Sequence, residues 1–277
     1  MRLTSWNLLH GLAIPPADMT NPGQNPALLA LSVGNLGSDI LGVQEVDFYL
    51  ERSGNQNQVG EIAALLGASY WAFAPSVIGS PDEKWRGTSA ADQKVVTQDM
   101  ALNSELATPG YGIGLISKLA VKSWHRLDLK ASPIGVLMAL PVDGKLKRIY
   151  VRDHPRSALA AVLENGWLIV NTHLSFVPIF NIFQLLKIKR WVKKLPVKNK
   201  YKIILMGDLN LPFGFLVKGF NWNSLAKQKT FPSWGPRLQL DFLLSQKIAS
   251  EDVTHTDSTH GGISDHLPLS VDIDTTT

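Results

Sequence analysis

The most constraining feature of this 277-residue chain is a set of short apolar runs that each end in a polar side chain. The first run ends at Asn7, the second at Glu45 and a later one at Asp208. Short apolar runs of this kind are typical of buried strands. Groups that directly follow the strands of one core converge at one edge of it, where ligands bind. The pattern predicts a strand-rich fold with one polar site at its edge.

The apolar runs predict more strands than helices. Helices are expected at residues 26–36, 59–66 and 183–195, and strands at residues 3–8, 39–45, 70–74, 113–117, 121–129, 135–140, 147–151, 158–163, 167–172, 203–207, 240–244, 253–256 and 267–273. Residues 76–110 are polar and lack clear periodicity, which predicts a long functional or mobile loop. Two mixed sheets packed face to face with helices outside would bury this pattern. The predicted fold class is therefore α/β.

Length and composition favour a single domain that spans residues 1–277. The length suits one large core, 45% of the residues are hydrophobic, and Gly and Pro are scattered rather than gathered in a linker. The absence of cysteine excludes disulfides, thiolate metal sites and cysteine nucleophiles. No signal-peptide pattern opens the sequence and no apolar run is long enough to span a bilayer. We therefore expect a cytoplasmic location, unless a leader was removed.

The charge balance favours an anionic partner. The formal net charge is +4, the sequence pI is about 9.2, and eight Lys or Arg residues lie between Lys187 and Lys202. Nucleic acid, a phospholipid surface and a phosphorylated metabolite all fit this balance. A solvated face of the helix expected at 183–195 is the simpler explanation of the basic stretch.

The residue types at the strand ends fit a hard divalent cation such as Mg²⁺. Glu45, Asn7 and Asp265 can supply the carboxylate and amide oxygens that such a cation prefers. The chain has no His-Glu-x-x-His motif or cysteine cluster that would favour zinc. A bound cation lowers the pKa of water and offsets charge on phosphorus, while His and Asp side chains supply base function and charge stabilisation. This combination indicates hydrolysis of a phosphate ester.

Eight short motifs, in order along nearly the whole chain, resemble those of the endonuclease/exonuclease/phosphatase superfamily. They are Ser5-Trp6-Asn7-Leu8, Gln44-Glu45-Val46-Asp47, Tyr111-Gly112-Ile113-Gly114, Arg156-Ser157-Ala158-Leu159, Asn171-Thr172-His173-Leu174, Gly207-Asp208-Leu209-Asn210, Gln239-Leu240-Asp241-Phe242 and Ser264-Asp265-His266-Leu267-Pro268. Each motif alone is common, but the ordered set is highly specific. The superfamily includes pancreatic-type deoxyribonucleases, apurinic endonucleases, neutral sphingomyelinases and inositol-polyphosphate phosphatases. The resemblance implies its fold, a four-layer sandwich of two packed mixed β-sheets flanked by helices.

The resemblance also implies a Mg²⁺ or Mn²⁺ cofactor and a role for each matching residue. Glu45 is the expected main metal ligand, with Asn7 and Asp265 as direct or water-mediated ligands. His266 is expected at the scissile phosphate, held by Asp241 in an Asp–His pair.

Three further catalytic residues follow from the same resemblance. Asp208 is expected to orient the attacking water, Asn210 to donate to a phosphoryl oxygen and His173 to contact the same phosphate. Whether His266 or Asp208 takes the proton of the water stays open at this point. Packing roles compete with these functions, because Asn210 can be a structural amide and His173 a core histidine.

Four residues are expected to bind substrate: Asn171, Arg156, Tyr111 and Trp234. Arg156 can clamp phosphate, although a structural ion pair near the site explains it equally well. Trp234 belongs to residues 230–234, which resemble a substrate-side loop of many prokaryotic members of the superfamily. The other histidines have no role assigned: His10, His125, His154, His255 and His260.

The sequence leaves the substrate open. A nuclease-like phosphodiesterase with a nucleic-acid substrate is the leading interpretation, because cations and aromatic residues mix at Trp85-Arg86 and along residues 187–194. A sphingomyelinase-like or phosphoinositide-type lipid phosphoesterase, with peripheral membrane contact, is the alternative, because residues 176–183 are apolar and precede a basic helix. Simple packing of residues 176–183 against the sheet competes with both. A non-catalytic binding module conflicts with the intact acids and histidine, and no obligate protein partner is evident.

Overall fold

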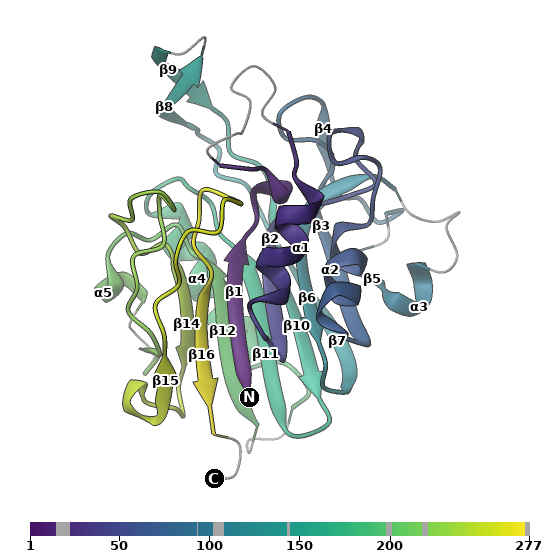
Figure 1. Cartoon of the computed structure of the whole chain (residues 1–277), viewed down its shortest axis with the longest axis vertical. Helices are drawn as coiled ribbons and strands as arrows, with labels where there is room; N and C mark the ends of the chain where they lie inside the picture. The colour runs from purple at the N-terminus through teal and green to yellow at the C-terminus, as the bar shows by residue number, and fades with distance from the viewer. Residues whose placement is uncertain are drawn as a thin grey trace.

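The computed structural model of the protein describes residues 1–14, 23–92, 94–101, 108–142, 145–197, 201–217 and 221–274. Two mixed β-sheets pack face to face, and helices cover their outer faces (Figure 1). The fold class predicted from the strand pattern is thus confirmed. No helix in these described ranges combines the length and the apolarity needed to cross a membrane.

The first sheet holds the N-terminal and C-terminal strands side by side. Its strands are, in spatial order, β15 (Val253–His255), β16 (Leu269–Ile273), β1 (Arg2–Asn7), β2 (Ile40–Phe48), β6 (Gly110–Ser117), β3 (Tyr70–Gly79) and β4 (Trp85–Gly87), with β5 (Val96–Thr97) also paired to β3. Strands β1 and β2 are parallel, and the other pairs are antiparallel.

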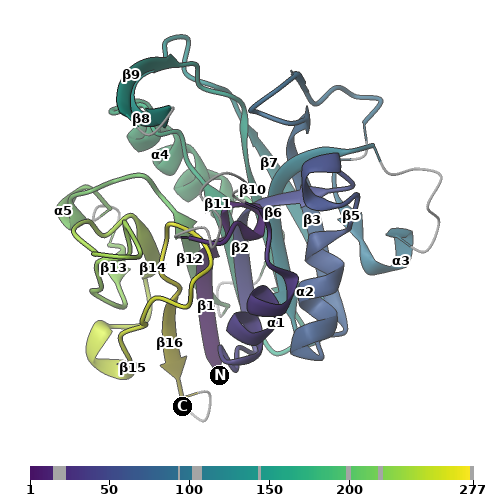
Figure 2. The ribbon, with the colours of Figure 1, turned by 45° about the horizontal axis from the view of Figure 1, so that its top comes forward.

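The second sheet has the same mixed character. Its order is β13 (Asn223–Ser224), β14 (Asp241–Ser245), β12 (Lys202–Asp208), β11 (Trp167–His173), β10 (Arg156–Leu163) and β7 (Val121–Leu129). Only β11 and β12 are parallel among these pairs. Strands β8 (Val136–Val142) and β9 (Lys145–Val151) form a separate hairpin that stands clear of both sheets (Figures 1 and 2).

The helices cover the outer faces of the sheets. Helices α1 (Pro26–Gly34) and α2 (Gln58–Leu66) pack on the first sheet, and α4 (Phe180–Val192) packs on the second (Figures 1 and 2). Asn25 and Asn57 cap the first two helices, because their side-chain oxygens accept from backbone N–H groups of the first turn. The remaining helices are short: α3 (Gln98–Ala101), α5 (Gly214–Val217), η1 (Leu9–Gly11), η2 (Glu51–Ser53) and η4 (Ser250–Asp252).

The central core fills the space between the two sheets. Apolar side chains from both inner faces meet there, among them Leu3 and Ile40 from the first sheet and Ile204 from the second. The sheets approach closely at Gly42, where an added Cβ would lie 2.7 Å from Cε of Met206. A larger residue at this point would have to displace the side chains of Met206 and Asn171.

The strand register brings the polar motifs to one end of this core. On the parallel pair β1–β2, Asn7 lies beside Gln44, whose neighbour is Glu45. On β11–β12, His173 lies beside Asp208, and Asp208 in turn lies beside Asp241 of β14. The parallel pairs end at the same edge, as expected from the sequence.

The prediction of a long loop at residues 76–110 is wrong in part. Strand β3 continues to Gly79, and β4, β5 and α3 follow within this range, while residues 93 and 102–107 lie outside the described residues. All three residues of β4 are exposed. A short edge strand without a buried face has no apolar alternation, so periodicity does not reveal it.

Candidate active site

A cleft of about 590 Å³ opens at the edge where the polar strand ends meet. Eight of the residues expected at the site line it: Glu45, Tyr111, Arg156, His173, Asp208, Asn210, Asp265 and His266. Asn7 and Asp241 lie directly behind these side chains as hydrogen-bond partners. The walls also contain apolar groups, of which Phe176, Phe231 and Leu240 are examples.

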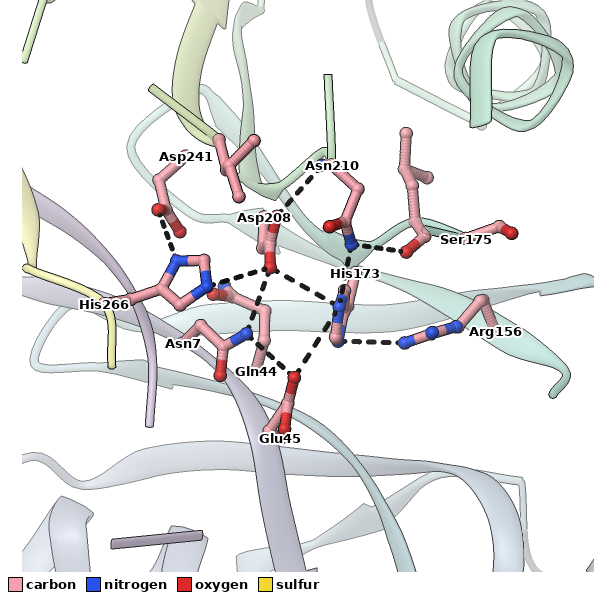
Figure 3. A network of polar contacts seen from close by, with 12 residues as sticks. Asn7, Gln44, Glu45, Arg156, His173, Ser175, Asp208, Asn210, Asp241 and His266 are labelled. Carbon is pink, nitrogen blue, oxygen red and sulfur yellow. Dashed lines mark hydrogen bonds and ion pairs between the residues drawn. The ribbon is translucent and has the colours of Figure 1, made fainter. Parts of the chain in front are cut away.

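The carboxylate of Asp208 lies at the centre of the polar network (Figure 3). Its Oδ2 accepts a hydrogen bond of 3.0 Å from Nδ2 of Asn7. The same oxygen lies 3.4 Å from Nε2 of His173 and 3.7 Å from Nε2 of His266. Burial raises the pKa of Asp208 to about 7, and the positive charge on His266 opposes this shift. A carboxyl group with a pKa near neutrality can exchange a proton at physiological pH.

Glu45 points toward the cleft because of a local irregularity in β2. The pairing of β2 with β6 shifts by one residue between Gln44 and Val46, and Glu45 has a φ of 54°. A bulge re-aims a side chain, and a left-handed non-glycine residue is a strained feature that concentrates at functional sites. Oε1 of Glu45 accepts a hydrogen bond of 2.9 Å from Nδ2 of Asn7. The amide of Asn7 therefore bridges the carboxylates of Glu45 and Asp208.

Asp265 is a partly buried acid with spare capacity to bind a ligand. Its Oδ1 is buried and has no hydrogen-bond partner among the described residues. Burial raises the pKa of its carboxyl group, and the positive charge on His266 opposes that shift. The preceding residue Ser264 has a φ of 64°, and its hydroxyl donates to the backbone oxygen of Asn7. This bond ties the Asp265 loop to the end of β1.

The imidazole of His266 is paired with a carboxylate on each side. Its Nδ1 lies 2.8 Å from Oδ2 of Asp241, and its Nε2 faces Asp208. Burial alone would lower the pKa of His266, but the charges on Asp241 and Asp208 outweigh it and raise the pKa to about 10. His266 therefore carries a positive charge at neutral pH.

Two sets of side chains at the site have the chemistry to hold a cation. Asp208, Asp241 and His266 place potential ligand atoms within 4.8 Å of one another. His266 is protonated at neutral pH and is hydrogen-bonded to Asp241, so its ring would have to lose a proton before it could ligate a cation at this first set. Glu45, Asn7 and Asp265 form the second set. The carboxylates of Glu45 and Asp265 offer hard oxygen donors, including the unpartnered Oδ1 of Asp265, while Oδ1 of Asn7 also accepts from the backbone N–H of Leu9 at 3.1 Å. Oxygen donors suit Mg²⁺ and Mn²⁺, so the second set fits such a cation better.

His173 is neutral, because burial and then the charge on Arg156 lower its pKa well below the usual value. Nη1 of Arg156 lies 3.1 Å from Nδ1 of His173. A guanidinium can only donate, so Nδ1 accepts and the ring proton resides on Nε2, which faces Asp208. Nδ2 of Asn210 lies 3.2 Å from the same Nε2 and donates to the backbone oxygen of Leu174. The bond from Arg156 therefore sets the tautomer of the neutral ring, and the amide nitrogen of Asn210 lies against the Nε2 side without a hydrogen bond to it.

Asn171 does not reach the cleft, contrary to the prediction that it binds substrate. Its side chain is fully buried between the sheets. Its Nδ2 donates to the backbone oxygens of Val43 and Gly114, and its Oδ1 accepts from Nε2 of Gln44. Every amide donor is used, so Asn171 is a structural bridge between the sheets. The sequence did not show this because a strand-end amide has the same pattern in both roles.

Trp234 also lies outside the set of cleft-lining residues. Its ring is exposed, in the loop that follows Phe231 and Pro232. Backbone hydrogen bonds hold this loop beside the site. In one of them the N–H of Ser233 donates to the backbone oxygen of Asp265 at 2.7 Å. Phe231, rather than Trp234, contributes the aromatic ring of this loop to the cleft, and that ring packs against His266 with centroids 5.0 Å apart.

His154 lines the cleft, although no role was predicted for it from the sequence. Its ring packs edge-on against Tyr111, with centroids 5.6 Å apart, and near Trp85 at 6.2 Å. Burial lowers the pKa of His154 to about 3, and the charge on Arg156 acts in the same direction. The signal that could have found His154 is its position two residues before Arg156, on the same strand end.

The basic helix α4 exposes fewer of its cationic and aromatic side chains than its sequence indicates. Lys189 is buried, donates to the backbone oxygen of Val217 and lies over the ring of Trp222. Trp191 is partly buried against the core of the second sheet. The alternation of cations and aromatic rings along residues 187–194 therefore does not form one exposed strand-binding face.

Comparison with known proteins places the chain in one family. A sequence profile described as the endonuclease/exonuclease/phosphatase family matches residues 4–266. No curated protein sequence matches the chain. Among solved structures, a mannosyl-6-phosphatase from Bacteroides thetaiotaomicron has a similar fold, with a TM-score of 0.60, 14% identity, and coverage of 98% of this chain and 98% of that one.

Two further solved structures have the same fold. The human Nocturnin catalytic domain with bound sulfate has a TM-score of 0.57 and 17% identity, and the match covers 98% of this chain and 93% of that one. An endonuclease/exonuclease/phosphatase from Beutenbergia cavernae has a TM-score of 0.56 and 16% identity, covering 99% of this chain and 71% of that one. At these identities the likeness concerns the fold alone. The profile match along nearly the whole sequence shows that the chain belongs to the endonuclease/exonuclease/phosphatase family.

Proposed function

We propose that this protein hydrolyses a phosphate ester with water, assisted by a divalent cation. The observation that carries the proposal is the placement of Oδ2 of Asp208, which lies within 3.7 Å of the amide of Asn7 and of two imidazoles, one neutral and one charged. Such a site can take a proton from water on one side and stabilise negative charge on the other. The family as a whole is generally dependent on divalent metal ions.

Glu45, Asn7 and Asp265 are the residues that we expect to hold Mg²⁺ or Mn²⁺. When bound, the cation would polarise a phosphoryl oxygen and offset its charge. The support for this placement is the chemistry of the donors and the unpartnered buried oxygen of Asp265. The side chain of Glu45 is 21% exposed and lines the cleft, so it is accessible to a cation.

Asp208 is the proton acceptor in this proposal. His266 is already protonated at neutral pH, because the negative charges on Asp241 and Asp208 raise its pKa. A protonated imidazole cannot act as a base, but it can donate to a phosphoryl or leaving-group oxygen. The raised pKa of Asp208 is suited to receive the proton of the attacking water. His173 and Asn210 line the same cleft, and their N–H groups are candidates to bind the phosphate.

The nuclease interpretation stays a prediction within this proposal. The cleft contains Arg152 and Arg156, and an aromatic wall of Trp85 and Tyr111, which suit an anionic ester with an attached ring. The fold neighbours include a mannosyl-6-phosphatase, so a phosphomonoester is the competing substrate.

The test is an activity screen with purified protein in Mg²⁺, Mn²⁺ or EDTA. The substrates are bis(p-nitrophenyl) phosphate, p-nitrophenyl phosphate, plasmid DNA, abasic duplex, RNA, sphingomyelin and phosphoinositides. We expect turnover of at least one ester that EDTA abolishes and that is lost in Glu45→Ala and His266→Ala. Turnover by these two variants at the wild-type rate would show that the catalytic assignment is wrong.

A further inference from the structure

The cleft is flanked by three segments that each continue into exposed apolar side chains. Val151 lines the cleft at the end of the β8–β9 hairpin, where the neighbouring Tyr150 is 55% exposed and its cross-strand partner Leu137 is 67% exposed. Water-exposed side chains of this size are unremarkable singly. Their repetition on each flank of one cleft is what requires an explanation.

The second segment runs from the end of β11 into α4. Phe176 and Pro178 line the cleft, and Ile179 and Phe183, which follow them, are 64% and 62% exposed. The competing expectation was that this whole stretch packs the helix on the sheet. Val177 is buried, as that expectation requires, but Ile179 and Phe183 are exposed.

The third segment is the loop that leads into α5. Pro212 lines the cleft, and Phe213 and Phe215 after it are 57% and 68% exposed. Their rings stack on each other, with centroids 5.8 Å apart. Two exposed phenylalanines in contact expose a larger apolar area than either would alone.

The first two segments are held together as one unit. Oδ2 of Asp153 accepts from the backbone N–H of Ser132 at 2.6 Å, at the base of the hairpin. The same oxygen accepts from the hydroxyl of Ser175 at 2.8 Å, just before Phe176. The hairpin therefore projects from the same flank of the cleft as the start of α4, and Figures 1 and 2 show it standing clear of the sheets.

The first two segments share a one-sided charge. Residues 136–142 and 145–152 of the hairpin contain four Lys or Arg residues, residues 176–197 contain five, and neither of these described stretches contains an acidic residue. Lys147, Arg148 and Arg152 on the hairpin are exposed, as are Lys187 and Arg190 on α4. Apolar side chains set among cations are complementary to a surface that presents negative charge over a hydrocarbon interior.

We propose that this apolar rim docks onto the surface of a bilayer that contains anionic phospholipid. The rim consists of Leu137, Tyr150, Ile179, Phe183, Phe213 and Phe215. Its side chains enter the boundary between headgroups and acyl chains, and the surrounding cations bind the headgroup charge. Docking turns the mouth of the cleft toward the headgroups. Resting on the proposed function, this orientation identifies the substrate class as the phosphate esters of lipid headgroups.

The experiment measures binding of the full chain to sedimented vesicles. The vesicles contain phosphatidylcholine, with or without phosphatidylglycerol. We expect binding to the anionic vesicles that weakens as salt is added, because the cationic contribution is screened. The double variants Phe213→Ser/Phe215→Ser and Leu137→Ser/Phe183→Ser should each bind about tenfold more weakly or worse, because each loses two large apolar groups at the interface.

Leu31→Ser is the matched control, since Leu31 is 61% exposed on α1, outside the three segments. It should bind vesicles like the wild type. Wild-type protein that stays in the supernatant, or double variants that sediment as well as Leu31→Ser, would overturn the docking proposal. So would self-association in analytical ultracentrifugation that the double variants abolish, because the rim would then be an interface between copies of the chain.

Hydrolysis of bis(p-nitrophenyl) phosphate, which is water-soluble, separates the two proposals. The Phe213→Ser/Phe215→Ser variant should retain wild-type turnover of this ester, because neither ring lines the cleft. Turnover without vesicle binding would overturn the docking proposal alone. Vesicle binding by a protein that hydrolyses no ester would overturn the proposed function alone.

Discussion

Nδ1 of His266 lies 2.8 Å from Oδ2 of Asp241, and both side chains are almost completely buried. The second carboxylate oxygen of Asp241 is also buried and has no hydrogen-bond partner in the described part of the chain. The charge of Asp241 is thus directed to a single partner. This pairing keeps the imidazole of His266 protonated and leaves its Nε2 free to face Asp208 and the cleft.

Asp241→Asn should lower kcat by about 10²-fold to 10⁴-fold, because the neutral amide no longer stabilises the imidazolium. The pKa of His266 should fall at the same time, since its largest favourable charge interaction is removed. Steady-state kinetics and NMR titration of the imidazole measure the two effects. A pKa for His266 that is unchanged in the variant would contradict the pairing.

Catalytic activity should rise with pH through about 7. Asp208 must lose its proton to act as a base, and burial raises its pKa to about 7. The rate is therefore low below this pH and reaches a plateau above it. Asp208→Asn should lower kcat by about 10²-fold to 10⁴-fold and remove the pH dependence in this range. A wild-type rate that is flat between about pH 5 and about pH 8 would exclude Asp208 as the base.

Glu45→Gln should weaken binding of Mn²⁺ strongly while leaving the thermal unfolding midpoint of the metal-free protein nearly unchanged. The carboxylate is partly exposed, so its loss removes a cation ligand and little packing. Isothermal titration calorimetry with Mn²⁺ measures the effect. Glu51→Gln, at an exposed position in η2, is the control and should bind like the wild type. Equal affinities for all three proteins would remove Glu45 from the metal site.

Asn171→Ala should destabilise the protein by about 2–4 kcal/mol, because it leaves buried partners unpaired and opens a cavity. The affected groups are the backbone oxygens of Val43 and Gly114 and the side chain of Gln44. Urea unfolding gives the free energy, with the exposed Asn223→Ala as the control. KM should not change under conditions where the variant is folded. A raised KM with unchanged stability would restore the substrate-binding role.

The free energy of unfolding should decrease as the pH is lowered, partly because of His154. Burial lowers its pKa to about 3 in the folded protein, from an ordinary value of 6.5. Between these two values the unfolded chain binds a proton that the folded protein does not, so acidification favours unfolding. In His154→Gln the decline should be less steep, by up to about 1.4 kcal/mol per pH unit. Urea unfolding at several pH values between about 7 and about 4 measures both slopes, and equal slopes would contradict the buried neutral ring.

Much of the fold follows from local patterns in the sequence. Buried strands such as β2, β11 and β12 are continuous apolar runs, and they were predicted within a few residues of their observed bounds. The exposed strand β4 was missed, because an edge strand without a buried face has no such run. Helix α4 begins three residues earlier than predicted, at Phe180 rather than residue 183. Helix ends depend on capping and tertiary contacts, which hydrophobic periodicity does not encode.

The sequence determined which residue types gather at the strand ends, because one apolar strand followed by one polar group is a local pattern. It therefore predicted Glu45 and Asp208 as members of one site, and the resemblance of the ordered motifs added His266. Tertiary structure alone decided which of these side chains contact one another. Asn7 bridges two carboxylates, whereas Asn171 lies between the sheets although it has the same local sequence pattern. The physical reason is that burial and hydrogen-bond partners depend on residues far apart in the chain, which meet only when the two sheets pack.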